Sequence, residues 1–189
     1  MAGLESFNIE QYKARFGDGA KASLFYYNPN WPAGISNFIV AEDAMYLVRS
    51  ATMPGSTRDE GTLNWQGFDY KYATKSTYSD ITVSFNVDIA AAIRQQFEQW
   101  LNLIHNPVDN TYALSFQYMA NQTMQMVGYD GSNILEFTLH HAWPKEVAQI
   151  AMDYSTPEVA QFDVTFSYQY HTMQSSETGG LSNLAGGLI

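Results

Sequence analysis

The stretch Gln161-Phe162-Asp163-Val164-Thr165-Phe166-Ser167-Tyr168-Gln169-Tyr170 alternates polar and apolar side chains without a break. Successive side chains of a β-strand point to opposite faces, so this alternation predicts a strand of an antiparallel sheet with one buried face and one solvated face. The solvated face contains no lysine or arginine. A polar, partly acidic face of this kind indicates a surface past which something slides, in contrast to a site that binds tightly.

The same alternation occurs in Ile81–Asp88, where apolar and polar residues again take turns, and the period then changes. From Ile89 to Ile104 the apolar residues follow helical spacing: Ile89, Ile93, Phe97, Trp100, Leu101 and Ile104. This spacing predicts an amphipathic helix that packs over the sheet, with Asp88 as N-cap and Asn106-Pro107 as its end.

Other short apolar runs predict further strands, and Asp130-Gly131 is a strong hairpin turn. These runs are Ser23–Tyr27, Phe38–Ala41, Met45–Ser50, Tyr112–Tyr118, Gln122–Tyr129, Leu135–Trp143 and Val147–Tyr154. Pro144 is expected to end the strand before it. The pattern predicts a mainly β fold, an antiparallel β-sandwich or partly open barrel with one amphipathic helix.

The length of 189 residues favours one domain, 1–189, with a core at 15–171 and a flexible C-terminal arm at 172–189. Between residues 50 and 72 glycine and a weak period predict a long loop. That loop contains Met53, Pro54, Leu63, Trp65 and Phe68, which make it too apolar for a free linker. We therefore expect it to dock on another surface.

Composition excludes several classes of function. The chain has no cysteine, no apolar run long enough for a membrane helix and no apolar signal core near Glu5 and Glu10, so a soluble protein is expected. Residues 1–94 have a net charge of −2 and residues 95–189 a net charge of −8. The acidic second half repels phosphates, which argues against tight binding of nucleic acid.

The sequence contains little that indicates catalysis or metal binding. His140 and His141 are neighbours in a predicted strand, so they point to opposite faces and do not share a metal. Glu136 and His140 share a face and allow a hydrolase hypothesis, but nothing places a nucleophile beside them. Gly17-Asp18-Gly19 lacks the setting and the lysine of a phosphate-binding loop. We expect no enzyme, no cofactor and no metal.

The predicted sheet edges are poorly protected against pairing with other chains. Monomeric β-proteins protect such edges with lysine, proline or inward charges. After Arg94 there are only Lys145 and, beyond the helix stop, Pro144 and Pro157. The sequence therefore favours edges that pair between copies, unless the helix or the 50–72 segment covers them.

Four segments resemble the tail tube proteins of contractile-tailed bacteriophages, a family related in fold to the Hcp tube protein of type VI secretion. They are Val48–Gly55, Tyr78–Asp88 with Phe97–Trp100, Tyr129–Gly131 with Ala142–Pro144, and Met152–Tyr154 with Gln161–Tyr170. The resemblance runs in order from about Arg15 to Tyr170. Thr74–Thr77 replaces a Gly-x-Arg element of the family, and the tail after His171 extends past its usual end.

The resemblance implies a structural virion protein that self-assembles into hexameric rings. The rings stack into a tail tube whose sheets join into one larger barrel and through which double-stranded DNA passes without specific binding. It further implies contacts with a tail sheath protein and with baseplate and tail terminator proteins, and assembly in the host cytoplasm. The alternatives are a secretion-system tube, a baseplate-proximal ring or, in another class, a small-ligand-binding β-barrel.

Two sets of residues carry the specific expectations. Asp80, Thr82, Ser84, Asp163, Thr165 and Ser167 are expected to face the lumen, because they form the polar sides of the two alternating strands. Met53, Pro54, Leu63, Trp65 and Phe68 are expected to contact the next ring.

Overall fold

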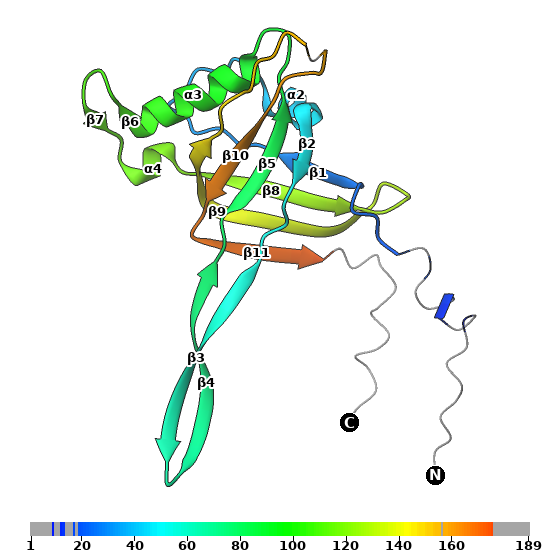
Figure 1. Cartoon of the computed structure of the whole chain (residues 1–189), viewed down its shortest axis with the longest axis vertical. Coiled ribbons are helices and arrows are strands. Elements are labelled where there is room, and N and C mark those ends of the chain that lie inside the picture. Colours follow the sequence, from blue (N-terminus) through cyan, green and yellow to red (C-terminus); the bar gives the residue numbers. More distant parts are fainter. Residues whose placement is uncertain (1–8, 10–11, 14–16, 18, 156, 176–189) are drawn as a thin grey trace.

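The protein is described from a computed structural model, which places residues 9, 12–13, 17, 19–155 and 157–175 (Figure 1). Two antiparallel sheets pack against each other, and they share one long, bent strand, β9 (Asn133–Val147). A helix covers the body on one side, and a long hairpin projects from it (Figure 1). The mainly β prediction is confirmed, and in the described part of the chain the sheets do not close into a barrel.

Sheet B contains the two strands that the alternating sequence predicted. Its order is β9-β10-β5-β2, with β10 at Gln161–Ser167, β5 at Ile81–Asn86 and β2 at Val48–Ala51. On β5 and β10, buried side chains alternate with more exposed ones, as expected. The predicted strand 161–170 is too long, however. The chain leaves sheet B at Tyr168-Gln169 and begins β11 (Tyr170–Ser175) in the other sheet.

Sheet A has the order β1-β8-β9-β11, with β1 at Phe25–Asn28 and β8 at Ala120–Val127. Because β11 continues to Ser175, the first four residues of the predicted flexible arm are a paired strand. The remainder of that arm, 176–189, lies outside the described residues.

Strand β9 joins the two sheets by bending at its middle. Its first half pairs with β8 and β11, and its last residues pair with β10. His141 lies at the bend with a positive φ of 56°. Pro144 was expected to end this strand, yet β9 continues through it to Val147. A proline is tolerated there because this half of β9 has β10 on one side only and carries a register shift.

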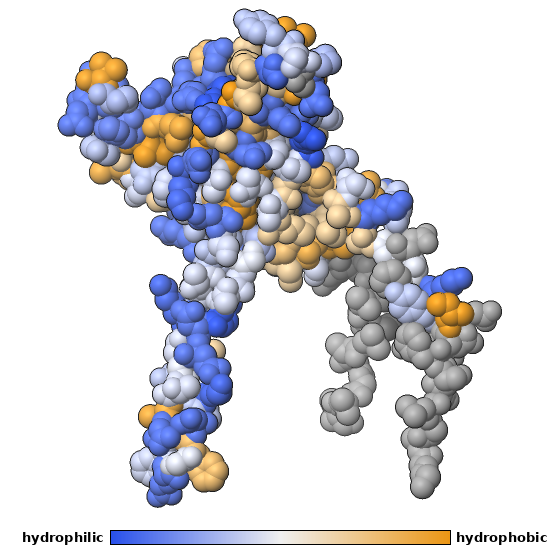
Figure 2. Space-filling model, viewed as in Figure 1, coloured by the Kyte–Doolittle hydropathy of each residue, from blue (hydrophilic) through white to orange (hydrophobic). Residues whose placement is uncertain are grey.

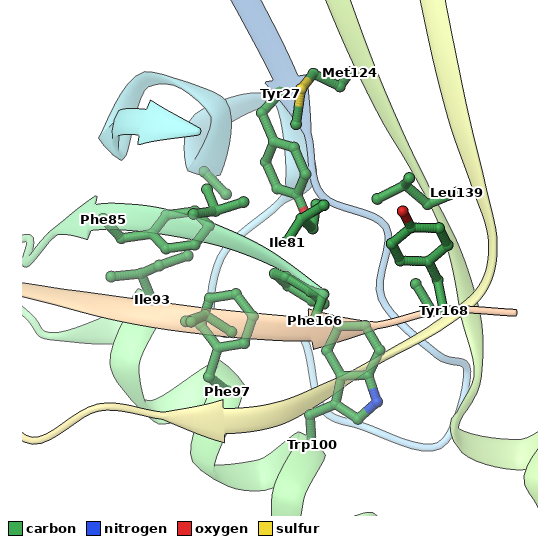
Figure 3. Packing of buried hydrophobic residues seen from close by; sticks show 14 of the residues in the cluster. Tyr27, Ile81, Phe85, Ile93, Phe97, Trp100, Met124, Leu139, Phe166 and Tyr168 are labelled. Atoms are coloured by element: carbon green, nitrogen blue, oxygen red, sulfur yellow. The ribbon is translucent and has the colours of Figure 1, made fainter. Parts of the chain in front are cut away.

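The helix α3 (Ala92–Ile104) packs on the inner face of sheet B. Phe97 and Trp100 of α3 contact Phe166 of β10 at ring-centroid distances of 6.0 and 6.1 Å (Figure 3). The backbone N–H of Ile93 donates to the Asp88 carboxylate, although the N-cap residue itself is Ala91. Burial opposes ionisation of Asp88, but backbone hydrogen bonds from Ala92 and Ile93 lower its pKa.

A buried glutamine links sheet A to the segment after β1. The Gln122 side chain accepts hydrogen bonds from the Tyr27 hydroxyl and the Asn30 N–H, both at 3.0 Å, and donates to the Asn30 carbonyl at 2.8 Å. All polar groups of this side chain are therefore satisfied inside the core.

The predicted long loop at 50–72 is wrong. Residues Ser56–Trp65 form β3 and Phe68–Tyr78 form β4, a two-stranded hairpin that extends away from the body (Figure 1). It prolongs β2 and β5 of sheet B along the chain. The hairpin has no sheet beneath it, so nearly all its side chains are exposed and a burial period is missing.

Three predicted strands, Phe38–Ala41, Tyr112–Tyr118 and Val147–Tyr154, are short helices or irregular segments instead. Residues 38–40 are irregular and lead into α2 (Ala41–Ala44). The predicted strand Met45–Ser50 is partly right, because the 3-10 turn η1 (Met45–Leu47) comes first and β2 begins at Val48. Residues 111–118 form the two-residue strand β7 (Thr111–Tyr112), which pairs with β6 (His105–Asn106), and then α4 (Ser115–Tyr118). Residues 148–154 contain no strand. Short apolar runs do not separate strands from buried turns.

Candidate assembly surfaces

The hairpin β3–β4 has one apolar face. Its register pairs Trp65 with Phe68, Leu63 with Tyr70 and Gly61 with Tyr72. Directly paired residues share a face, so these side chains form one continuous row. We call this row the aromatic ladder: Leu63, Trp65, Phe68, Tyr70 and Tyr72.

The aromatic ladder is exposed to solvent in the single chain. Its side chains are between 48 and 81% exposed. The rings of Tyr70 and Tyr72 stack at 6.5 Å, and Tyr72 lies so close over Gly61 that a Cβ there would come within 2.7 Å of the ring. An exposed apolar row of this kind marks a contact surface.

The opposite face of the hairpin is polar. Asn64 donates to Asp69 at 2.7 Å, and Lys71 forms an ion pair with Glu60 at 2.8 Å. The ribbon is therefore amphipathic, although nothing in the described chain covers its apolar face. Tyr70 and Tyr72 were missed by the sequence analysis, but the alternation Phe68-Asp69-Tyr70-Lys71-Tyr72 was a signal for them.

The predicted contact residues divide into two groups. Leu63, Trp65 and Phe68 belong to the aromatic ladder. Pro54 is buried and Met53 is half-buried against the core of the body, where their own chain covers them.

An aromatic cluster fixes the root of the hairpin to both sheets. Tyr78, at the end of β4, contacts the His171 ring of β11 at 5.2 Å, and His171 also contacts Phe137 and Tyr168. Burial, with the charge of Arg58 as the lesser cause, lowers the pKa of His171. Burial raises the pKa of Tyr168. The cluster therefore favours a neutral imidazole at the hairpin root.

The six residues expected to line a lumen lie on or beside the outer face of sheet B. The register pairs Ser84 with Asp163 and Thr82 with Thr165, and the Ser84 hydroxyl donates to the Asp163 carboxylate. Ser167 pairs with Trp143 of β9. The structure thus brings these strands together as one polar surface.

Positive charge borders this surface at two places. Lys145 forms an ion pair with Asp80 at 2.7 Å, which raises the pKa of the lysine. Arg49 borders an open hollow of about 490 Å³ whose floor includes Ser84 and Asp163. The strands themselves carry only neutral and acidic outward side chains, as predicted.

Sheet edges remain unpaired in the described part of the chain. The outer side of β2 has no strand beside it, and β1 and β11 form the two edges of sheet A. Neither β2 nor β11 contains a proline, and Arg49 is the one lysine or arginine that these two strands contain. These edges are open to pairing with another copy.

The hydrolase hypothesis gains no support from the geometry. The Glu136 carboxylate accepts hydrogen bonds from Gln125 and Asn133, whereas His140 contacts Thr172 and stacks on Tyr170. No group of metal-binding side chains occurs among the described residues. Within the same residues, no helix is long and apolar enough to span a membrane.

Comparison with protein families identifies this architecture. A model described as "Phage tail tube protein" matches residues 12–174. The chain belongs to the phage tail tube protein family. Members of this family are structural tube proteins. None of the curated proteins compared matches the chain significantly.

Solved structures of contractile injection systems share the tail tube fold. A chain of the sheath-tube complex of an extracellular contractile injection system, PVC, in its extended state aligns with a TM-score of 0.62 and 14% identity over 90% of this chain and 100% of that one. A chain of the tube-terminating cap of the anti-feeding prophage aligns with a TM-score of 0.61 and 14% identity, over 83% of this chain and 91% of that one. A chain of the anti-feeding prophage baseplate, 6-fold symmetrised, aligns with a TM-score of 0.56 and 17% identity, over 81% of this chain and 93% of that one.

Proposed function

We propose that this protein is the subunit of an inner tail tube, in which six copies form a ring and rings stack. The observation that carries the proposal is a tail tube fold whose sheet B ends at the unpaired strand β2. In a ring, each open edge pairs with the neighbouring subunit, and closure removes the edges altogether. The 6-fold symmetry of the anti-feeding prophage baseplate, which contains a similar chain, supports six copies.

In this proposal the outer face of sheet B lines the lumen. The paired Ser84 and Asp163, with Thr82 and Thr165 beside them, present neutral hydroxyl groups and one carboxylate, and the negative carboxylate repels phosphates. The formal charge of −10 per copy adds to that repulsion around a ring. Double-stranded DNA then transits without adhering to the wall.

The aromatic ladder provides the contact between rings. The hairpin that carries it projects away from the body of its own subunit (Figure 1). The ladder side chains are exposed to solvent there. Burying these side chains between copies removes apolar surface from water, worth about 25 cal/mol per Å². Repetition of the contact around a ring multiplies its effect.

The tube acts within a virion tail that is assembled in the host cytoplasm, with sheath, baseplate and terminator proteins as partners. The structures that resemble the chain come from a sheath-tube complex, a cap and a baseplate, which supports these kinds of partner. The role is structural, and we expect no enzymatic turnover.

A tube of an injection or secretion particle that carries no genome is the second candidate. It is favoured by the similar chains of PVC and the anti-feeding prophage. A ring near the baseplate or the tube terminus belongs to the same group. Nuclease-protected DNA in purified particles separates the tail from the injection particle.

Native mass spectrometry of the purified protein tests the ring. One copy has a mass of 21.3 kDa, so six copies give about 128 kDa. A species of that mass, or a multiple of it, is expected as concentration rises. A protein that remains at 21.3 kDa at high concentration contradicts the proposal.

A further inference from the structure

The end of the molecule opposite the hairpin also exposes apolar side chains. The β5–α3 loop and the β9–β10 loop lie together there, joined by a hydrogen bond of 2.8 Å from the Val87 N–H to the Ala160 carbonyl (Figure 1). We call these loops, 87–91, 148–155 and 157–160, the crown. Its most exposed large apolar residues are Ile89, Met152, Tyr154 and Val159.

The crown holds its apolar side chains outward by local structure. The Asp153 carboxylate accepts hydrogen bonds from the Ser155 N–H at 2.9 Å and the Ser155 hydroxyl at 2.8 Å, which fixes a turn around Tyr154. Ile89 and Tyr154 are fully exposed, and Met152 is 83% exposed. Large side chains in this state indicate a surface that another molecule covers.

We propose that the crown of one subunit receives the aromatic ladder of a second copy in the next ring. This inference rests on the proposed function, because it names the partner surface for its inter-ring contact. When rings stack in the same orientation, the contacts between them are heterologous: one end of a subunit meets the opposite end of a subunit in the next ring. The hairpin and the crown lie at the two ends of the long axis of this chain (Figures 1 and 2).

Shape and reach agree with this pairing. A ten-residue strand such as β3 extends about 33 Å, enough to carry the distal ladder beyond the body of its own subunit. Met152 is a flexible side chain that adapts to aromatic partners such as Trp65 and Phe68. The crown and the aromatic ladder each expose several large apolar side chains, and contact between them removes both sets from solvent.

The described crown contains Asp88, Asp153 and Glu158 and no lysine or arginine. The hairpin carries equal numbers of basic and acidic side chains, Arg58, Lys71 and Lys75 against Asp59, Glu60 and Asp69. It therefore does not repel the acidic crown as a second acidic surface would.

A second exposed apolar patch lies at the side of the molecule and serves as the comparison. It is formed by the segment after α3, with Val108, Tyr112, Leu114 and Phe116 exposed. Because this side patch is not at the end opposite the hairpin, a ring stacked along the long axis does not bring the ladder to it (Figure 1).

Engineered disulfides test the pairing, since the chain has no cysteine of its own. The double variant Gln66→Cys with Ala151→Cys places one thiol at the hairpin turn and one at an exposed position of the crown, and leaves the ladder, Tyr154 and the Asp153–Ser155 turn intact. The matched control pairs Gln66→Cys with Ser115→Cys, on the side patch. Oxidation of the assembled protein is expected to give a series of covalently linked oligomers for the first pair of cysteines and none for the control pair.

Two readouts keep the outcomes distinct. Tubes that are intact by electron microscopy but give no oligomers, or oligomers only with Ser115→Cys, overturn the crown assignment and leave the tube itself standing. Failure of the unmodified protein to form tubes contradicts the proposed function, and this inference with it. If the cysteine variants do not assemble, hydrogen exchange of the unmodified tube decides: protection of both 63–72 and 148–160 supports the pairing, and an unprotected crown overturns it.

Discussion

At the scale of single residues, the lumen hypothesis depends on Asp163. This carboxylate is on the outer face of sheet B and accepts a hydrogen bond from Ser84. Replacing Asp163 by lysine adds a ring of positive charge that binds phosphates, so DNA delivery should fall at least roughly tenfold. Asp163→Asn is the matched neutral control and should change delivery far less. Unchanged infectivity of Asp163→Lys particles with normal tails would count against this placement.

Gln122 tests the interior of the body. Gln122→Leu leaves the Tyr27 hydroxyl and the Asn30 backbone groups without their partner in a dry core. The free energy of unfolding should fall by roughly 3 kcal/mol, because buried polar groups are then unsatisfied. Urea denaturation measures it. Gln125→Leu, which removes a partly exposed bond to Glu136, is the control and should cost about 1 kcal/mol or less.

His171 should make stability depend on pH. Burial, and secondarily Arg58, lowers its pKa in the folded protein, so the unfolded chain takes up the proton first. The stabilising contribution is therefore complete above the unfolded pKa of about 6.5 and is lost as pH falls toward the folded pKa. His171→Phe should lose less stability than the wild type between pH 7.5 and 5. An equal loss in both proteins, measured by thermal unfolding, would refute this role.

At the scale of elements, the hairpin β3–β4 is the feature that sequence reasoning misjudged. Its glycine and its lack of a burial period resembled a loop, because no second layer covers it. The ladder was visible only as the short alternation Phe68, Tyr70, Tyr72. By contrast, β5, β10 and α3 could be predicted, because each buries one face in the core and therefore shows its period.

Which strands pair with each other, and in which register, could not be predicted from the alternation of side chains. The alternation predicted that Ser84 and Asp163 lie on polar faces, but not that they are paired, because register is set by contacts between distant strands. The change of sheet at Tyr168-Gln169 left the alternation intact, so the sequence did not reveal it.

The ladder should matter for assembly and not for folding. Trp65 is 70% exposed in the single chain, so Trp65→Ala should change the free energy of unfolding by no more than about 0.5 kcal/mol. It should raise the concentration needed for tubes at least roughly tenfold, equivalent to about 1.4 kcal/mol of lost contact. Asn64→Ala, on the polar face, is the control. Light scattering measures assembly, and equal thresholds for both variants would exclude the ladder from the contact.

At the scale of the whole molecule, the open sheet edges and the projecting hairpin have one property in common: both are surfaces that a single copy leaves uncovered. A single copy leaves the edge of β2 unpaired and the aromatic ladder uncovered, although its interior is well packed. In the proposed tube, sister copies pair with the strand edges laterally and cover the hairpin axially. In that arrangement the polar face of sheet B lines the inside.

Negative-stain electron microscopy of the purified protein at increasing concentration tests this account most directly. We expect hollow tubes built from stacked rings. Particles that stay single and compact at the highest concentration, with no rings or tubes, would contradict it.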